Sequence, residues 1–454
     1  MSHAEPIQSP PVLWKVYLAF LGPMIVSNIL QALSGTVNNI YLGQMLGVKA
    51  MAAVSALFPV LFFFIAFMIG LGAGAAILIG QAWGAKELGR VKAIAGTTLM
   101  VGLYAGLVVA AFGGTFTEMM LRALETPADI LPEATAYARI MLIAAPGLFL
   151  FLLVTSMLRG VGDTTTSLLT LLISTGVSLL LTPALILGWA GLPRLGVTSG
   201  AYAAAVSFLV ALGWTAWYLL RKHHPLAPDA TFIRHLRIDR SILLKILFVG
   251  LPTALSMITI SVAEIAVLFL VNRHGSQATA AYGAVNQIVS YVQFPAISIA
   301  ITASILAAQA IGAGRGHTLG KIARTGIMMN LVLTGALVGL GYLFSCHILG
   351  LFITDMAVVD MAQTLLHIML WSSVIMGMSM VLSGLMRASG NVLMPTAITM
   401  FAIAGIEIPA AWVLNQFYGL NGIWASYPIA FLAMLALQTA YYRLVWKKKP
   451  LRRL

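Results

Sequence analysis

Two carboxylates in this sequence lie inside long apolar stretches, where a charge is rarely found. Glu264 and Glu407 occupy such positions, whereas the other members of the set of 13 acidic residues lie in the N-terminal tail, in loops or near helix ends. Burying an isolated charge in hydrocarbon costs several kcal/mol, so an ionisable residue in such a stretch is a candidate for function. Glu264 precedes Arg273 by nine positions, which places it roughly 13 Å from that boundary at the rise of a helix. Its side chain is therefore too deep to reach water by extending along the helix.

A carboxylate in apolar surroundings can alternate between a proton and a cation. Loss of water favours the protonated form, whereas a cation beside the oxygens favours the ionised form. Because the two occupants exclude each other, the arrival of one drives the release of the other. Glu264 is thus the leading candidate for coupling H⁺ to the movement of an organic cation. Na⁺ at Glu264 is the alternative ion, although one carboxylate with amides is a sparse ligand set for a metal cation; a neutral acid that only joins two helices is the structural alternative.

Glu407 is the second candidate for ion coupling, within Gly405-Ile406-Glu407-Ile408-Pro409. The proline lacks an N–H and leaves a backbone carbonyl of the preceding turn without its helical partner. A protonated Glu407 can satisfy that carbonyl. Two roles are therefore open for Glu407: ion coupling, and a hydrogen bond to the backbone carbonyl that the proline leaves free.

A further group of uncharged side chains can line a substrate cavity in the same stretches. Amide side chains bind solutes, although they also join helices in membranes. Tyrosine rings suit flat organic cations. Methionine provides an adaptable wall, although a core or lipid-facing role is the plainer explanation. The candidates are Gln31, Asn38, Tyr282, Asn286, Gln287, Tyr291 and Met376.

The elements that must position these residues follow from the composition. The chain has 60% hydrophobic and 9% charged residues, against roughly 25% charged residues in an average soluble domain. Its apolar stretches reach about 20 residues or more, the length that a helix needs to cross a hydrocarbon layer of about 30 Å. We therefore expect an all-α membrane protein with twelve transmembrane helices, since the strands of a membrane barrel are shorter and alternate in polarity. The expected spans are 15–44, 50–80, 91–114, 134–158, 166–189, 198–221, 241–272, 279–310, 321–345, 358–386, 394–417 and 422–447.

The net charge of +13 does not indicate a nucleic-acid partner, because the basic residues flank the spans. They concentrate after even-numbered spans, at 86–92, at 315–324 and in the tail at 447–453. By the positive-inside rule, both termini are expected to be cytoplasmic.

The first ten residues lack the basic start and cleavage site of a secretory signal, so we expect the first span to remain in the mature protein. Cys346 is the single cysteine, which argues against an internal disulfide or a metal cluster.

The sequence also contains an internal repeat. Gln81–Ala85 (QAWGA) matches Gln309–Ala313 (QAIGA), and Arg159–Asp163 (RGVGD) matches Arg387–Asn391 (RASGN); both pairs are offset by 228 positions, from 81 to 309 and from 159 to 387. A half with six spans enters and leaves on one side, so the two six-helix lobes are expected to be related by a pseudo-two-fold axis along the membrane normal. The expected domains are an N-lobe at 1–221, a cytoplasmic linker at 222–240 and a C-lobe with a basic cytoplasmic tail at 241–454.

The linker is basic and contains two prolines, which is typical of a tether between lobes. Ile233 and Leu236, with Leu243 just beyond, can instead form one apolar face of a surface helix. Both structures are compatible with the sequence.

The sequence resembles the multidrug and toxic compound extrusion (MATE) family along nearly its whole length. The resemblance rests on 43–53 (GQMLGVKAMAA), 80–85 (GQAWGA), 158–164 (LRGVGDT) and the segment from Phe294-Pro295 through Ala313. It implies two six-helix lobes around a central cavity and the export of small cationic or amphiphilic organic compounds, driven by H⁺ or Na⁺. It also implies a multi-pass protein of the bacterial cytoplasmic (inner) membrane that uses no cofactor, catalyses no reaction and acts as a monomer.

The departures from the family pattern concern the coupling site. Many members have Val-Asp-Thr in the first helix, where this chain has Val37-Asn38-Asn39, and Asn-x-x-x-Asp-Pro in the fifth, where it has Ser178, Thr182 and Pro183. An amide cannot be deprotonated, so the acidic site of the N-lobe is missing. In the seventh helix one branch has a glutamate at a position that matches Ile260, one turn before Glu264; that branch's acid in the tenth helix falls near Met376. The resemblance therefore implies coupling through the C-lobe, led by Glu264.

Three other functions compete with drug efflux. A flippase for lipids or glycan-lipids has related lobes, but its anionic cargo calls for arginines well inside the spans, and the sequence shows none there. A dedicated exporter of one metabolite is compatible with the lost N-lobe aspartate. A membrane-embedded enzyme needs a cluster such as His with Asp or Glu, whereas only isolated candidates occur in this sequence. The natural substrate is not defined by the sequence.

Overall fold

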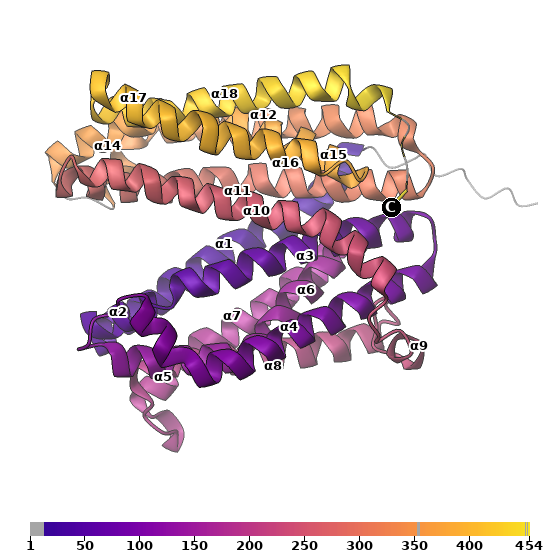
Figure 1. Ribbon diagram of the computed structural model, residues 1–454, viewed down its shortest axis with the longest axis horizontal. Helices are drawn as coiled ribbons and strands as arrows, with labels where there is room; N and C mark the ends of the chain where they lie inside the picture. Colours follow the sequence, from indigo (N-terminus) through magenta and orange to yellow (C-terminus); the bar gives the residue numbers. More distant parts are fainter. Residues whose placement is uncertain (1–12, 352–354, 450, 452) are drawn as a thin grey trace, which may run out of the picture. The chain divides into compact units, whose positions relative to one another are not determined.

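The computed structural model describes residues 13–351, 355–449, 451 and 453–454. The first ten residues, whose composition bears on a signal peptide, and Arg452 of the basic tail lie outside this set. The described residues form α-helices with short 3-10 and π segments, and no strand occurs among them (Figure 1). This confirms the expected all-α class.

The first half of the chain follows the predicted spans, with two breaks. The expected span at 50–80 is formed by two helices, and the one at 134–158 is formed by two helices that meet at 51°. A proline opens the second helix at each break, where its fixed φ and missing N–H are tolerated. The helices are α1 (Leu13–Leu46), α2 (Val48–Ser55), α3 (Phe58–Gly84), α4 (Leu88–Ala123), α5 (Leu131–Ile143), α6 (Ala145–Val161), α7 (Thr164–Leu187), α8 (Ser199–Arg221) and α9 (Ala230–Ile233).

The second half is likewise helical, and its most unusual element is a π-helical segment, η4 (Phe401–Glu407). Pro409 lies in the first turn of the helix that follows it. The wider π turn accommodates the proline, which cannot donate a backbone hydrogen bond. The helices are α10 (Arg240–Asn272), α11 (Ser276–Gly312), α12 (Leu319–Leu343), α13 (Ser345–Gly350), α14 (Met356–Met369), α15 (Ser372–Ala388), α16 (Leu393–Met400), α17 (Ile408–Tyr418) and α18 (Leu420–Leu444).

These helices are long and apolar enough for a multi-pass membrane protein. Eleven spans among the described residues meet the length and hydropathy expected of a membrane helix, and the bent pair of α5 and α6 provides a twelfth. The count agrees with the twelve spans predicted from the sequence.

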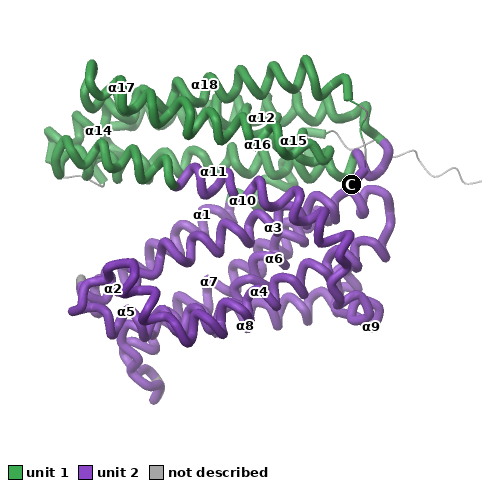
Figure 2. Tube along the Cα trace, in the orientation of Figure 1, with its two compact units in different colours: residues 1–25, 262–310, 315–451 green, residues 26–261, 311–314, 452–454 purple. Residues whose placement is uncertain are grey.

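The chain packs into two compact units (Figure 2). Unit 1 comprises Met1–Ile25, Val262–Ala310 and Arg315–Leu451, and unit 2 comprises Val26–Ser261, Ile311–Gly314 and Arg452–Leu454. The unit boundaries fall within α1, α10 and the end of α11. The domain boundaries expected from the repeat, 1–221, 222–240 and 241–454, stay a prediction.

In unit 2 two glycines of α3 bring its backbone against α10. A Cβ added at Gly70 would lie 2.5 Å from the carbonyl oxygen of Gly250, and one added at Gly74 would lie 2.6 Å from that of Ile246. Glycines four residues apart form one groove on a helix and let a second helix approach closely, as is common in membranes. The sequence therefore needs small residues at these positions for packing.

The linker is docked on unit 2 over much of its length. Lys92 Nζ of α4 donates to Asp229 Oδ2 at 2.7 Å, and Thr97 Oγ1 donates to the carbonyl oxygen of Arg237 at 3.1 Å. The Phe232 side chain is buried in the core of unit 2. The alternative of an amphipathic surface helix is not formed, because α9 has four residues and ends at Ile233.

Breaking the contact between Lys92 and Asp229 is expected to release the linker. Hydrogen bonds from Lys92, from the Thr231 hydroxyl and from the Phe232 N–H hold the pKa of Asp229 well below its ordinary value. A lowered pKa stabilises the docked form at neutral pH, and this contribution is lost as the pH falls below the carboxyl's unfolded value of about 3.9. Asp229→Asn should therefore be cleaved by trypsin at Arg234 and neighbouring basic residues several-fold faster than wild type at pH 7.

The matched control for this prediction is Glu118→Gln. Glu118 pairs with Arg122 at 2.7 Å on an exposed helix surface, where such a pair contributes little to stability. Equal cleavage rates for Asp229→Asn and Glu118→Gln would show that the Lys92 contact does not hold the linker.

Candidate functional site

The two candidate carboxylates belong to one cluster within unit 1. Glu264 lies on α10, and Glu407 is the last residue of η4. Their charges are close enough to act on each other, and both act on Tyr282 of α11 and Tyr427 of α18. Four elements that are far apart in sequence therefore meet at this cluster.

Aromatic and amide side chains hold the cluster together. The hydroxyl oxygens of Tyr282 and Tyr427 lie 3.3 Å apart, and the ring of Tyr282 stacks on Trp424 with centroids separated by 5.2 Å. The Asn286 side chain acts on the Tyr282 hydroxyl, as expected for two residues one helical turn apart. The tyrosine is thus held against two aromatic residues of α18.

Glu407 is buried, with 3% of its surface exposed. Among the described residues its carboxyl group has no hydrogen-bond partner, so the structure shows no bond from this acid to a carbonyl freed by Pro409. The indole N–H of Trp424 is also buried without a partner among the described residues. Buried polar groups are normally paired, so the unpaired indole N–H of Trp424 indicates a place for an additional hydrogen-bond acceptor, such as a water molecule or a polar solute.

Glu264 differs from Glu407 because its side chain is exposed on unit 1. Val262 and Ile265, which are close to it in the chain, are likewise exposed, to 56% and 68%. The cluster therefore combines one acid that a solute can contact directly with one that lies inside the fold.

The remaining C-lobe candidates make other interactions. Gln287, Tyr291 and Met376 are half-buried. Met376 packs against the apolar core of unit 1, and Tyr291 makes an edge contact with Phe294. Tyr282 and Asn286 thus join the carboxylates, whereas no hydrogen bond or ion pair links the other three to Glu264 or Glu407 among the described residues.

In unit 2 the positions that carry the family's N-lobe pattern do lie together. Thr182 Oγ1 donates to the Ser178 carbonyl oxygen at 2.7 Å and lies 3.4 Å from Asn38 Oδ1. Asn38 is half-buried, and Gln31 is exposed. The group is polar and uncharged, so it offers no proton to exchange.

Asn38→Ala is expected to lower the rate of transport by about threefold or less. Asn38 makes one long hydrogen bond, to Thr182, and a single hydrogen bond between membrane helices contributes little free energy. Initial rates of efflux of a fluorescent cation from cells that express each variant at equal levels would measure this. A loss comparable to that of a Glu264 variant would place the coupling site in unit 2 instead.

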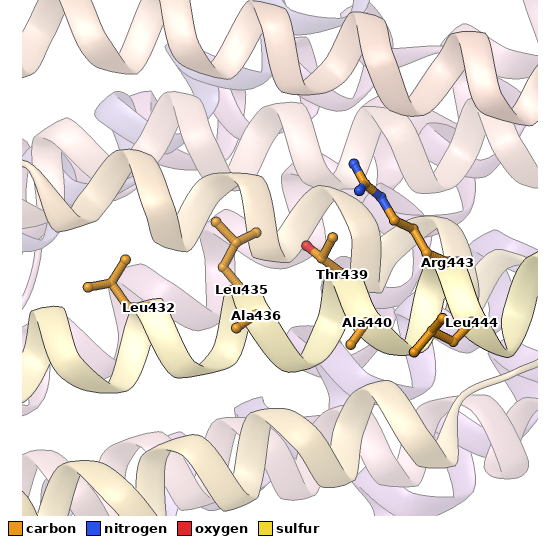
Figure 3. A pocket seen from close by; sticks show the side chains of 7 residues that line it. All are labelled: Leu432, Leu435, Ala436, Thr439, Ala440, Arg443 and Leu444. Atoms are coloured by element: carbon orange, nitrogen blue, oxygen red, sulfur yellow. The ribbon is translucent and has the colours of Figure 1, made fainter.

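The structure also contains a shallow groove of about 550 Å³ along α18 (Figure 3). It is lined by one stripe of that helix, which is apolar except for Thr439 and Arg443. Trp424 and Tyr427 precede this stripe in α18 and are not among its lining residues. The groove therefore lies apart from the carboxylate cluster.

No metal centre is evident from the side chains that the structure describes. No group of three or more His, Cys, Asp or Glu residues converges among them. The possibility of Na⁺ at Glu264 stays a prediction.

Trp424 and Tyr427 are functional candidates that the sequence analysis missed. Both lie in the last span, which has no acid to draw attention to it. Their spacing of three residues puts them on one helix face, but only the packing of α18 against η4 and α11 brings that face to the glutamates.

Comparison with known proteins gives a consistent family assignment. The sequence model of the MatE family matches the chain twice, at residues 23–184 and 252–413. The probable multidrug resistance protein YoeA of Bacillus subtilis is 44% identical over 98% of this chain and 97% of its own length. The multidrug export protein MepA of Staphylococcus aureus is 24% identical over 95% of this chain and 94% of its own length.

Solved structures show the same fold. A MATE protein in complex with MaL6 aligns with a TM-score of 0.88 and 22% identity, over 95% of this chain and 96% of its own. An outward-facing multidrug resistance MATE transporter aligns with a TM-score of 0.86 and 22% identity, over 95% of both chains. The twofold match of the family model and the 44% identity to the Bacillus protein show that this chain belongs to the MatE family of multidrug efflux transporters and is not an enzyme.

Proposed function

We propose that this protein exports cationic or amphiphilic organic compounds from the bacterial cytoplasm in exchange for H⁺, through the cluster of Glu264 and Glu407. The observation that carries the proposal is the cluster itself: two carboxylates and three aromatic residues from four elements, with no basic side chain paired to either acid among the described residues. Structural acids inside membranes pair with other groups. Acids without such partners are suited to reversible occupancy.

The exchange follows from competition at Glu264. In its ionised form the exposed carboxylate attracts an organic cation, while the nearby aromatic rings favour the same charge through their faces. Protonation removes the negative charge and with it the affinity for the cargo. A proton that arrives from outside therefore releases the cation there, and loss of the proton to the cytoplasm restores binding.

Protons are preferred over Na⁺ as the coupling ion. Na⁺ needs several oxygen ligands in a fixed geometry, and one exposed and one buried carboxylate are a sparse ligand set for it. A proton needs a single oxygen. Asn38 and Thr182 supply no acid in unit 2, which supports coupling through unit 1 alone.

The proposed orientation has both termini in the cytoplasm. Clusters of basic residues follow even-numbered spans, at 86–92, 315–324 and 447–453, as expected for cytoplasmic segments. The names of the relatives from Bacillus and Staphylococcus support substrates of the drug type. We propose a monomer as the working form.

Export of anionic lipid carriers receives less support. The two arginines at the ends of spans, Arg159 and Arg387, donate to Ser156 and Ser383 of their own helices at 2.9 Å and 2.8 Å. Arginines bonded within their own last turn act as anchors of a helix end. Bonded in this way, they are less available to an anionic headgroup.

The test uses purified protein in vesicles and a fluorescent organic cation. A pH gradient without Na⁺ should drive accumulation of the cation, whereas a Na⁺ gradient without a pH gradient should not. Accumulation that requires Na⁺ would contradict the proton assignment, and no accumulation under either gradient would contradict the proposed function.

A further inference from the structure

We propose that this transporter selects organic dications, whose two positive charges are held by Glu264 and Glu407 together. This inference rests on the proposed function and names the substrate class of the same site. It predicts that Glu407 determines the charge of the preferred cargo, while Glu264 remains the point of exchange.

The placement of the two acids supports two charge positions at different depths. Glu264 is exposed on α10, whereas Glu407 is buried at the end of η4. Ala263, next to Glu264, and Ile403, one turn before Glu407, belong to the same apolar core. The two acids thus provide separate negative charges, and the residues next to them pack in the same apolar core.

Aromatic surface lies around these two points. Tyr282 interacts electrostatically with both acids and stacks on Trp424. Aromatic faces attract alkylammonium groups and also pack against apolar carbon. A molecule with a cationic group at each end and an apolar body between them would place one charge at each acid and its body against the aromatic rings.

The charge balance favours a dication over a monocation. None of the described residues pairs a Lys, Arg or His side chain with Glu264 or Glu407. A monocation bound while both acids are ionised leaves one negative charge without a partner in a poorly solvated site, which is costly. A dication neutralises both acids in one binding event and needs no second ion.

The unpaired groups of the site fit the same conclusion. The carboxyl of Glu407 has no hydrogen-bond partner among the described residues, although its side chain is 3% exposed. A buried acid in a structural role normally has such a partner. An acid that lacks one retains its capacity to bind a cationic group.

The experiment compares two permanently charged series that differ in the number of charges. Alkanes with a trimethylammonium group at both ends are matched to alkyltrimethylammonium ions of equal carbon number, and dissociation constants are measured by calorimetry on purified protein at pH 8. Because neither series can be deprotonated, pH acts only on the protein. We expect the best dication to bind at least about tenfold more tightly than its matched monocation, the order expected for one additional partly buried ion pair.

Glu407→Gln tests the assignment of the inner charge. The substitution should weaken dication binding far more than monocation binding, so that the ratio of the two dissociation constants falls to about one. Glu118→Gln, which removes an exposed acid outside the cluster, should leave the ratio at its wild-type value.

Each outcome bears on one claim. A wild-type ratio near one at every alkane length overturns the inference without any variant, and so does a preference that persists in Glu407→Gln. Neither result touches gradient-driven transport of a monocation, which tests the proposed function on its own. Failure of that transport, with dication binding intact, would overturn the proposed function instead.

Discussion

Replacing Glu264 with glutamine is expected to reduce proton-driven accumulation of an organic cation at least about tenfold, because removing one charge partner in a partly desolvated site costs more than 1.4 kcal/mol. Glutamine keeps the size of the side chain but cannot exchange a proton. The exposed position of Glu264 on α10 means that the amide fits without repacking. The measurement is fluorescent-cation uptake into vesicles under an imposed pH gradient, at matched protein content.

Two controls give this result its meaning. Glu118→Gln removes an acid that pairs with Arg122 on an exposed helix surface, and it should transport like wild type. Equal elution of the Glu264 variant and wild type on size exclusion would show that the fold is retained. Undiminished coupled transport by Glu264→Gln would rule out the role given to this residue.

The double substitution Gly70→Ala with Gly74→Ala is expected to destabilise unit 2 strongly. Each new methyl group would meet a backbone carbonyl oxygen of α10, at 2.5 Å for Gly70 and 2.6 Å for Gly74. Backbone atoms cannot rotate away as a side chain can, so α3 and α10 must separate. Overpacking of this kind costs about 1–3 kcal/mol per site, and the apparent melting temperature in detergent should fall by several degrees.

Gly176→Ala on α7 is the matched control for this prediction. A Cβ at Gly176 would meet nothing within 4 Å, and alanine in a helix is more stable than glycine by roughly 0.5–1 kcal/mol. Its melting temperature should therefore stay level or rise. A double variant at positions 70 and 74 that melts like wild type would show that close approach of these helices does not contribute to stability.

The fold could be predicted largely because membranes restrict structure to a few solutions. The long apolar runs predicted membrane helices. The repeated segments at 81–85 and 309–313 indicated two halves, which the twofold family match confirms. The breaks that open at Pro59 and Pro146 were not predicted, although both prolines are visible in the sequence. Hydropathy averages over a break of one or two residues and does not detect it.

The candidate site could be predicted only in part. Glu264 and Glu407 stood out singly, because each is an acid in an apolar run, but 143 positions separate 264 from 407 and nothing in the sequence indicated that they share a cluster. Their partners Trp424 and Tyr427 are uncharged and ordinary in a membrane helix. The π segment that ends at Glu407 depends on how the chain accommodates Pro409 against α18, which local sequence does not determine.

The linker shows a similar limit. Its prolines and basic residues indicate a tether, yet Asp229 and Phe232 are held by residues of α4 and by the core of unit 2. The amino-acid composition of a segment indicates whether the segment can form its own core. It does not indicate which surface the segment packs against. Contacts such as that between Lys92 and Asp229 join positions that are far apart in the chain.

The most direct test of the exchange at Glu264 is the release of protons when cargo binds to the purified protein. A permanently charged organic cation is added in weakly buffered solution near neutral pH, and the change in pH is compared with the amount bound by calorimetry. We expect wild type to release protons in proportion to the bound cation, and Glu264→Gln to release markedly fewer. Binding of the cation to wild type with no release of protons would contradict competition between cargo and proton at this acid.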